Sequence, residues 1–304
     1  MYIWIPITIL AAIMQTTRTS LQKSLKVNLS SQSITWIRYL FGLPIVVVYI
    51  LILGFIGLDF PVINRMFIIY SLIAGFFQIL GTILLVSLFS HRNFAVSTAY
   101  AKTEAIQVVI IGTILFDQHI SFTSTIAILI GVLGVILISL VQDNVSWYSL
   151  FIGLRHKYVL IGICCGASFS IDALLIREAI LILEISSPVM GAATSLLAIV
   201  IINLIMLGGW ILITEKDAFR SIYSYRNKSA LVGLTSALGS IAWFSAFALT
   251  EVAYVKAVGQ IEVIFSILVT QKLFKEGMNR LELLAVFLIG ISILVLVYLS
   301  LIHI

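Results

Sequence analysis

Long apolar runs separated by short polar stretches make up most of this sequence. Ten runs approach or exceed the roughly 20 residues that an α-helix needs to cross a bilayer. They lie near residues 3–24, 33–55, 65–89, 94–116, 122–141, 158–180, 187–213, 229–249, 252–273 and 281–301. The connections are short, and even the longest, 142–157 and 214–228, are too short for a soluble domain. The pattern predicts an all-α membrane protein with ten transmembrane helices.

Two of these runs carry a similar arrangement of polar residues. Moving residues 94–107 forward by 158 positions brings Ala95 onto Ala253 and Glu104 onto Glu262. Each run then reaches a phenylalanine, a short polar hinge and a further apolar run that contains an Ile-Gly pair. This recurrence indicates an internal duplication.

The duplication predicts a domain organisation. Residues 1–141 form a first five-helix repeat, 142–157 a linker and 158–304 a second five-helix repeat. Because each repeat has an odd number of spans, the second is inverted relative to the first, as in many secondary transporters with a binding site near the midplane. We expect runs 122–141 and 281–301 to be peripheral. The expected cavity lining comes from runs 3–24, 65–89, 94–116, 158–180, 229–249 and 252–273.

Composition supports a membrane location. Of the 304 residues, 61% are hydrophobic and 10% charged, against about 25% charged in soluble domains, and the mean hydropathy is +1.18. We expect a multi-pass protein of the cell (inner) membrane whose partners are the lipid bilayer and a small-molecule substrate. The net charge of +5 indicates orientation in a membrane rather than nucleic-acid binding. The sequence leaves open whether the protein forms a homodimer.

The sequence lacks the motifs of nucleotide hydrolysis and of metal binding. The sequence contains no P-loop and no Cys/His metal cluster, and Cys164 and Cys165 are adjacent in an apolar run. We therefore expect no cofactor, no metal and no enzymatic activity. The first residues, MYIWIPITIL, lack a basic n-region and a cleavage site, so no cleaved signal peptide is expected.

Charged residues inside apolar runs are candidates for function, because each costs at least about 2.5 kcal/mol at the bilayer centre. Helical spacing places Tyr100, Glu104 and Gln107 on one face, with Lys102 about 200° away from Glu104. The matching run of the second repeat contributes Lys256, Gln260 and Glu262. One hypothesis is a polar cavity in which these residues bind substrate or protons. The alternative is that the glutamates pair with basic residues to join helices.

The first apolar run has a polar second half that includes Gln15 and Arg18 on one face. Without this half the run is too short to span, so we expect Arg18 inside the membrane boundary, lining the same cavity. The alternative is a helix that ends early, with Arg18 at the interface. A pair between Arg18 and Asp172 would be a gate or a strut. Arg38 could equally be an interface anchor or a ligand contact.

The chain resembles the EamA family of the drug/metabolite transporter superfamily. The resemblance rests on ten helices in two copies, each of which ends with an apolar helix, a polar hinge and a helix that contains an Ile-Gly pair. The acidic hinge residue of that family is matched by Glu276, while Gln118 stands at its place in the first repeat, next to Asp117. Where the family often has a proline, this chain has Ala105 and Val263.

The resemblance implies a secondary active transporter for a small polar or amphipathic metabolite, with proton coupling as an option. One alternative is a flippase for a lipid-linked substrate in the same superfamily. A more remote alternative is an intramembrane enzyme.

Loop charges predict an orientation. Arginine and lysine concentrate in the connections after the odd-numbered runs, and the positive-inside rule places these loops in the cytoplasm and both termini outside it. The family resemblance implies cytoplasmic termini instead, and we prefer the charge count. The residues counted are Lys23, Lys26, Arg92, Arg155, Lys157, Lys216, Arg220, Arg226, Lys228, Lys272, Lys275 and Arg280, against Arg65 and Arg177 in the other loops.

Overall fold

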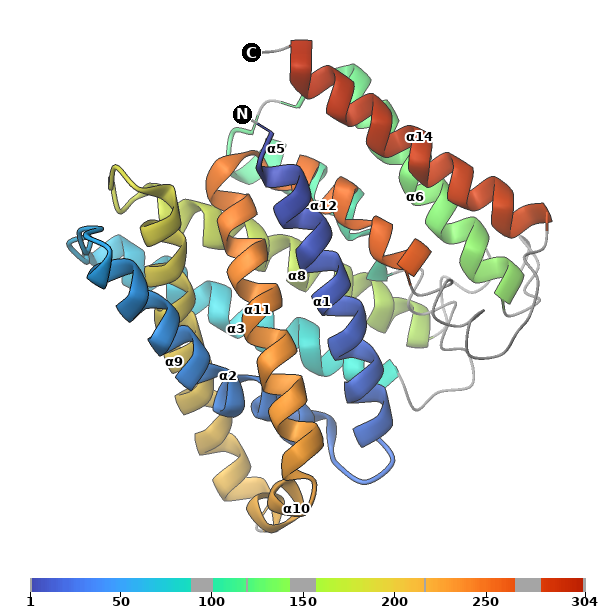
Figure 1. Ribbon diagram of the computed structural model, residues 1–304. Helices are drawn as coiled ribbons and strands as arrows, with labels where there is room; N and C mark the ends of the chain where they lie inside the picture. The colour runs from blue at the N-terminus through green and yellow to red at the C-terminus, as the bar shows by residue number, and fades with distance from the viewer. Residues whose placement is uncertain are drawn as a thin grey trace.

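The structure, a computed structural model, describes residues 2–88, 101–118, 120–142, 157–215, 217–265 and 280–302. Its regular elements over these ranges are all α-helices (Figure 1). They are α1 (Trp4–Leu25), α2 (Ser31–Phe55), α3 (Arg65–Leu88), α5 (Glu104–Leu115), α6 (Phe122–Gln142), α8 (Lys157–Leu181), α9 (Pro188–Thr214), α10 (Ala218–Ser224), α11 (Arg226–Leu249), α12 (Val252–Gly259) and α14 (Arg280–Ile302). The short helix α10 was not expected from the sequence.

Five of these helices, α2, α3, α8, α9 and α11, are long and apolar enough to cross a membrane. The described parts of α5, α6 and α14 are shorter apolar helices. The expectation of an all-α, multi-pass membrane protein is therefore confirmed, while the total of ten spans in two inverted repeats stays a prediction.

Local sequence signals account for several helix boundaries. Ser30 caps α2, because its hydroxyl accepts a hydrogen bond from the backbone N–H of Ser33 at 3.0 Å. Ser187 caps α9 in the same way through Met190, and Pro188 occupies the first turn of that helix. The α1 helix continues through its polar half to Leu25 and buries Arg18. The alternative of an early helix end is therefore wrong.

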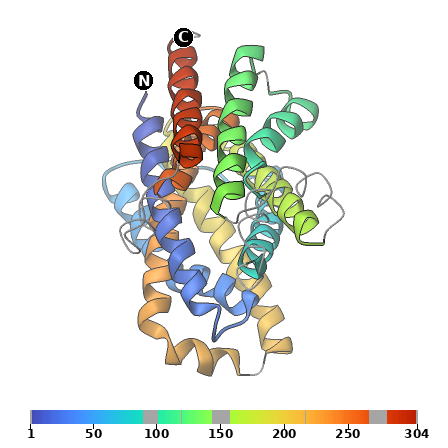
Figure 2. The same cartoon turned by 90° about the vertical axis from the view of Figure 1, so that its right-hand side faces the viewer.

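Helices of the first half of the chain pack against helices of the second half. The most extensive contacts join α3 with α8, α6 with α14, α1 with α11, and α2 with both α11 and α9. The α6–α14 pair lies to one side of the bundle (Figures 1 and 2), as expected for peripheral helices. Both chain ends lie at the same end of the bundle in Figure 1.

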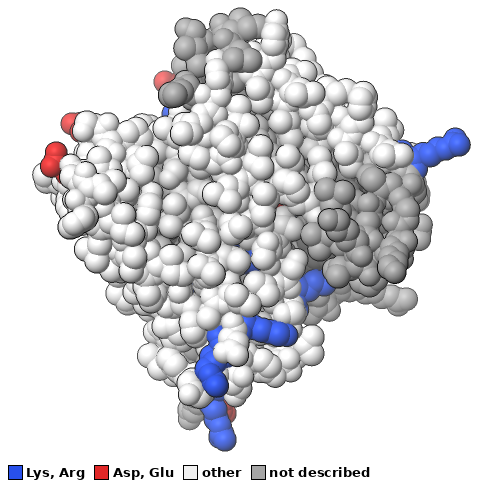
Figure 3. Space-filling model, in the orientation of Figure 1, with Lys and Arg blue, Asp and Glu red and all other residues white. Residues whose placement is uncertain are grey.

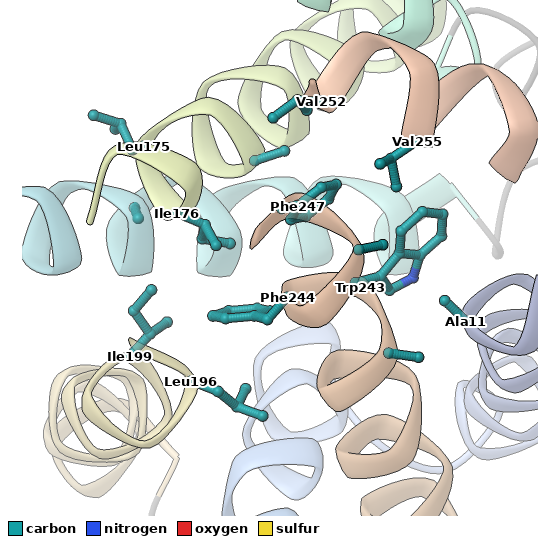
Figure 4. Packing of buried hydrophobic residues seen from close by; sticks show 14 of the residues in the cluster. Ala11, Leu175, Ile176, Leu196, Ile199, Trp243, Phe244, Phe247, Val252 and Val255 are labelled. Atoms are coloured by element: carbon teal, nitrogen blue, oxygen red, sulfur yellow. The ribbon is translucent and has the colours of Figure 1, made fainter. Parts of the chain in front are cut away.

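The apolar core surrounds one end of α11. Figure 4 shows Trp243, Phe244 and Phe247 of α11 among aliphatic residues of neighbouring helices, and all belong to a single buried cluster. Leu175 and Ile176 come from α8, Leu196 and Ile199 from α9, and Val252 and Val255 from α12. This packing holds α12 and its polar C-terminal end close to α1 and α5.

A glycine allows the close approach of α2 and α11. A Cβ added to Gly233 would lie 2.3 Å from Cβ of Phe41 and 2.6 Å from its backbone carbonyl carbon. Small residues permit such backbone contacts between membrane helices. Since part of the obstruction is backbone, the two helices would have to separate to admit a methyl group.

We predict that Gly233→Ala lowers the free energy of unfolding by about 1–3 kcal/mol through overpacking. The matched control is Gly209→Ala in α9, because a Cβ there has no neighbour within 4 Å. Thermal unfolding of the purified protein in detergent should show a lower Tm for Gly233→Ala only. Equal Tm values for both variants would contradict this account of the α2–α11 contact.

Candidate functional site

The helices that carry the two intramembrane glutamates are interrupted at equivalent positions. Ala101 is helical, Lys102 and Thr103 form a turn, and α5 begins at Glu104. In the second half α12 ends at Gly259, Gln260 forms a turn, and residues 261–265 are helical again. Lys102 and Gln260 are 158 positions apart, the same offset that aligns Glu104 with Glu262.

The expectation of uninterrupted helices over 94–116 and 252–273 is therefore wrong at these points. At the second break the backbone N–H groups of Gln260 and Val263 donate to the carbonyls of Ala257 and Gln260, each three residues earlier. This spacing is tighter than that of an α-helix, and such irregular turns within helices often mark functional hinges. Interrupted helices at membrane depth are tolerated where protein buries them or where they line a cavity.

Two ion pairs connect the interrupted helices across the halves of the chain. Lys102 pairs with Glu262, and Lys256 pairs with Glu104. Each half therefore supplies one lysine and one glutamate, and each pair joins the first half to the second. The helical spacing excluded a pair between Lys102 and Glu104, and both residues instead find partners in the other half. The four side chains are largely buried.

Polar and aromatic groups from α1 and α11 complete this cluster. The Gln15 amide nitrogen donates to Oε2 of Glu262 at 2.8 Å, and Nε1 of Trp243 donates to Oε1 of Gln15 at 3.0 Å. The ammonium of Lys256 lies 5.1 Å from the ring centre of Trp243 and 5.4 Å from that of Phe247. Cations are attracted to aromatic faces at such distances. Trp243 thus contacts both the amide and the ammonium of the cluster.

The cluster encloses a small cavity of about 20 Å³. A cavity of this size holds about one water molecule, so the helices must move to admit a metabolite. Its lining comes from α1, α5, α11, α12 and the turns beside them, without a residue from α3 or α8. The lining residues are Gln15, Lys102, Glu104, Ala105, Trp243, Lys256, Gly259, Gln260 and Glu262.

Asp172 of α8 belongs, with Gln78 of α3, to a second buried polar cluster. Gln78 of α3 donates to the two carboxylate oxygens of Asp172 at 3.5 and 3.4 Å, and accepts a hydrogen bond from Nδ2 of Asn203 at 3.1 Å. Arg38 of α2 donates to the hydroxyl of Thr82 at 2.6 Å. Arg38 is only 6% exposed, so it is not an interface anchor.

Some sequence-derived candidates lie elsewhere. Gln107 donates to the hydroxyl of Thr103 at 2.8 Å and to the carbonyl of Ile163 in α8 at 3.5 Å, and it does not line the cavity. Tyr100 lies outside the described residues, as does Glu276.

The expected pair between Arg18 and Asp172 is not formed. Arg18 donates instead to Oε1 of Gln15 at 3.3 Å, while Asp172 accepts from Gln78. Thr82 and Asn203 were not among the residues expected from the sequence. Each is a polar residue within an apolar run, and this is the pattern by which the sequence could have indicated them.

Comparisons with known proteins agree with the fold. Residues 2–140 match the model of the EamA-like transporter family. No curated protein matches the chain. A solved crystal structure superposes with a TM-score of 0.71 at 13% sequence identity, covering 97% of this chain and 96% of the other. At this identity the likeness concerns the fold alone.

The fold and the buried polar clusters define an integral membrane protein of many helices. Over residues 2–140 the chain is similar to the EamA-like transporter family, part of the drug/metabolite transporter superfamily. The expectation drawn from the sequence is confirmed.

The crossed pairing can be tested with charge exchanges. Glu104→Gln should lower the free energy of unfolding by about 3–5 kcal/mol, because it leaves the buried Lys256 ammonium without its partner. Exchanging the charges, Glu104→Lys with Lys256→Glu, should restore most of the loss in Tm measured in detergent.

A mismatched exchange is the control. Glu104→Lys combined with Lys102→Glu keeps the net charge but places an ammonium against Lys256 and a carboxylate against Glu262. If this variant recovers stability as well as the matched exchange does, the crossed arrangement is wrong.

Proposed function

We propose that this protein is a secondary active transporter of the drug/metabolite type that moves a small polar or amphipathic metabolite across the cell membrane. The crossed ion pairs Lys102–Glu262 and Lys256–Glu104 are the observation that carries the proposal. They lie at helix interruptions, in contact with a cavity, between the two halves of the chain. Secondary transporters built from inverted repeats bind substrate and coupling ions in such places.

Transport needs a site whose affinities differ between the two access states. The two glutamates supply such a site, because each carboxylate is stabilised by a lysine of the other half. When the halves move relative to each other, the distance within each pair changes. When a lysine and its glutamate separate, the buried carboxylate is left without its partner. Proton uptake neutralises this carboxylate and removes the free-energy cost of burying its charge. Proton binding and rearrangement of the halves are thereby linked.

Exposure to the two sides of the membrane also requires contacts that close each end in turn. At one end Arg177 of α8 donates to the backbone carbonyls of Phe247 and Thr250 at 2.7 and 2.6 Å and to Oε1 of Glu251 at 2.8 Å. At another, Glu215 after α9 accepts hydrogen bonds from the hydroxyls of Ser30 and Ser33. Both contacts join segments that are far apart in the sequence and must rearrange if the helices separate.

Glu104→Gln and Glu262→Gln should each abolish proton-driven accumulation while the protein stays folded. The neutral amide cannot exchange a proton, although it keeps the shape of the side chain. The assay uses the protein in liposomes with a pH-sensitive dye inside, no nucleotide, and a library of metabolites added one at a time under an imposed pH gradient. Solute exchange without a gradient should survive in at least one variant.

Asp59→Asn serves as the control, since Asp59 is an exposed residue of the α2–α3 connection. It should leave accumulation and its pH dependence unchanged. Accumulation with unaltered pH dependence in both glutamate variants would assign the carboxylates a structural role and end the proton-coupling hypothesis.

The orientation proposed from the loop charges places both termini outside the cytoplasm. On the face shown in Figure 3, most lysine and arginine side chains lie toward the lower end of the molecule, opposite the termini in Figure 1, and a further basic side chain projects at the right-hand edge. Arg220, Arg226 and Lys228 are exposed around α10 and the start of α11, at that end. The positive-inside rule assigns such an end to the cytoplasm.

A C-terminal fusion to a reporter that is active only in the cytoplasm should therefore give a low signal. The same reporter inserted in the α9–α10 connection should give a high signal. The reverse result would place the termini in the cytoplasm.

A further inference from the structure

Two buried arginines, on α1 and α2, have no acidic partner in the described part of the chain. Arg18 of α1 is 4% exposed and Arg38 of α2 is 6% exposed. Among the described residues neither lies within 4.0 Å of a carboxylate oxygen. A guanidinium group carries five N–H donors. Within the described ranges, Arg18 makes one side-chain hydrogen bond, to Gln15, and Arg38 makes one, to Thr82. Nε of Arg18 is buried without a partner in the described part of the chain.

The guanidinium carbon of Arg38 lies 5.1 Å from the centre of the Tyr39 ring. Asp172 accepts hydrogen bonds from Gln78 and forms no ion pair with either arginine within 4.0 Å. Of the buried charges, the lysines and glutamates of the central cluster cancel in pairs. Among the residues that the structure describes, two buried arginines and one buried aspartate remain, which leaves an excess of one positive charge. Burying such a charge is costly unless an anion compensates it.

Hydroxyl groups and a small cavity accompany Arg38. The cavity has a volume of about 10 Å³ and lies between α2, α3, α9 and α11. Tyr39, Gln78, Ser236 and Ser240 line it together with Arg38, and the hydroxyl of Ser236 is buried without a partner among the described residues. Separation of α2 and α11 would enlarge it. Guanidinium and hydroxyl donors converging on a buried space suit the oxygens of a carboxylate or a phosphate.

We propose that Arg18 and Arg38 form an anion subsite that binds the carboxylate or phosphate group of the transported molecule. This inference rests on the proposed transport function and narrows its substrate to anionic or zwitterionic molecules.

Gln15 connects the subsite to the central ion pairs. Its Oε1 accepts from Arg18 and its Nε2 donates to Glu262. An anion that draws the Arg18 guanidinium toward itself weakens the bond to Gln15 and disturbs the support of Glu262. Substrate binding at the arginines thereby acts on the Lys102–Glu262 pair.

The test measures binding separately from transport, by thermal unfolding of the purified full-length protein in a neutral detergent. Three matched probe pairs are titrated at constant ionic strength: succinate against succinamide, glycerol 3-phosphate against glycerol, and phosphatidylglycerol against diacylglycerol. At least one anionic probe should raise the Tm more than its uncharged counterpart. The soluble probes and the lipid distinguish a dissolved substrate from a lipid headgroup, and a response to either supports the subsite.

Variants assign the response to the arginines. Arg38→Gln and Arg18→Gln should each raise the apparent Kd for the active anion by about tenfold or more, the loss expected for a hydrogen bond to a charged group. Arg38→Lys should retain part of the affinity, because it keeps the charge but not the fork of donors. Arg220→Gln, at an exposed arginine of α10, should bind like the unmodified protein.

Two outcomes would overturn the subsite. In one, no anion stabilises the unmodified protein more than its counterpart. In the other, the preference for the anionic probe persists undiminished in both Arg38→Gln and Arg18→Gln. If Arg38→Gln does not fold, Arg38→Lys takes its place in this comparison. If the protein binds an anion but transports nothing in liposomes, only the transporter proposal is contradicted. If it transports neutral or cationic solutes and binds no anion, only the subsite is contradicted.

Discussion

Two ion pairs between the halves of the chain are the interaction on which the centre of this structure depends. Burying four charges in a membrane protein is costly, and the cost is offset only when every charge has a partner. Here each lysine has its partner in the opposite half: Lys102 with Glu262, and Lys256 with Glu104. Neither half can satisfy its own charges in this arrangement. The pairs therefore hold the two halves together in this structure. Its stability depends on the charge of each glutamate.

The helix interruptions follow from the same constraint. A continuous helix would point Lys102 and Glu104 to different sides about 200° apart. The turn at Lys102 and Thr103 and the turn at Gln260 let each half present its lysine and glutamate to the other. Apolar packing around Trp243, Phe244 and Phe247 holds the interrupted segments in place. Trp243 serves both purposes, because its ring faces Lys256 and its N–H group binds Gln15.

The buried charges are balanced at the centre of the structure and unbalanced at the two buried arginines. Among the described residues, the four lysines and glutamates at the centre cancel in charge, while Arg18 and Arg38 together exceed the single buried carboxylate of Asp172. A transporter gains specificity when its substrate supplies a charge that the protein lacks, because an uncharged competitor leaves the buried donors unpaired. Gln15 contacts both Arg18 and Glu262 and so joins Arg18 to the central ion pairs by hydrogen bonds.

The sequence by itself determined the fold class, the positions of most helices and the residue types at the centre. Lengths of apolar runs and charges within apolar segments are local properties, so they can be read from the chain. The tertiary structure decided which partners those charges have. It broke the helices at Lys102 and Gln260, placed Gln107 against α8, and kept Arg18 apart from Asp172. Those outcomes depend on how distant segments pack, and repeat symmetry suggested matching positions without fixing distances between them.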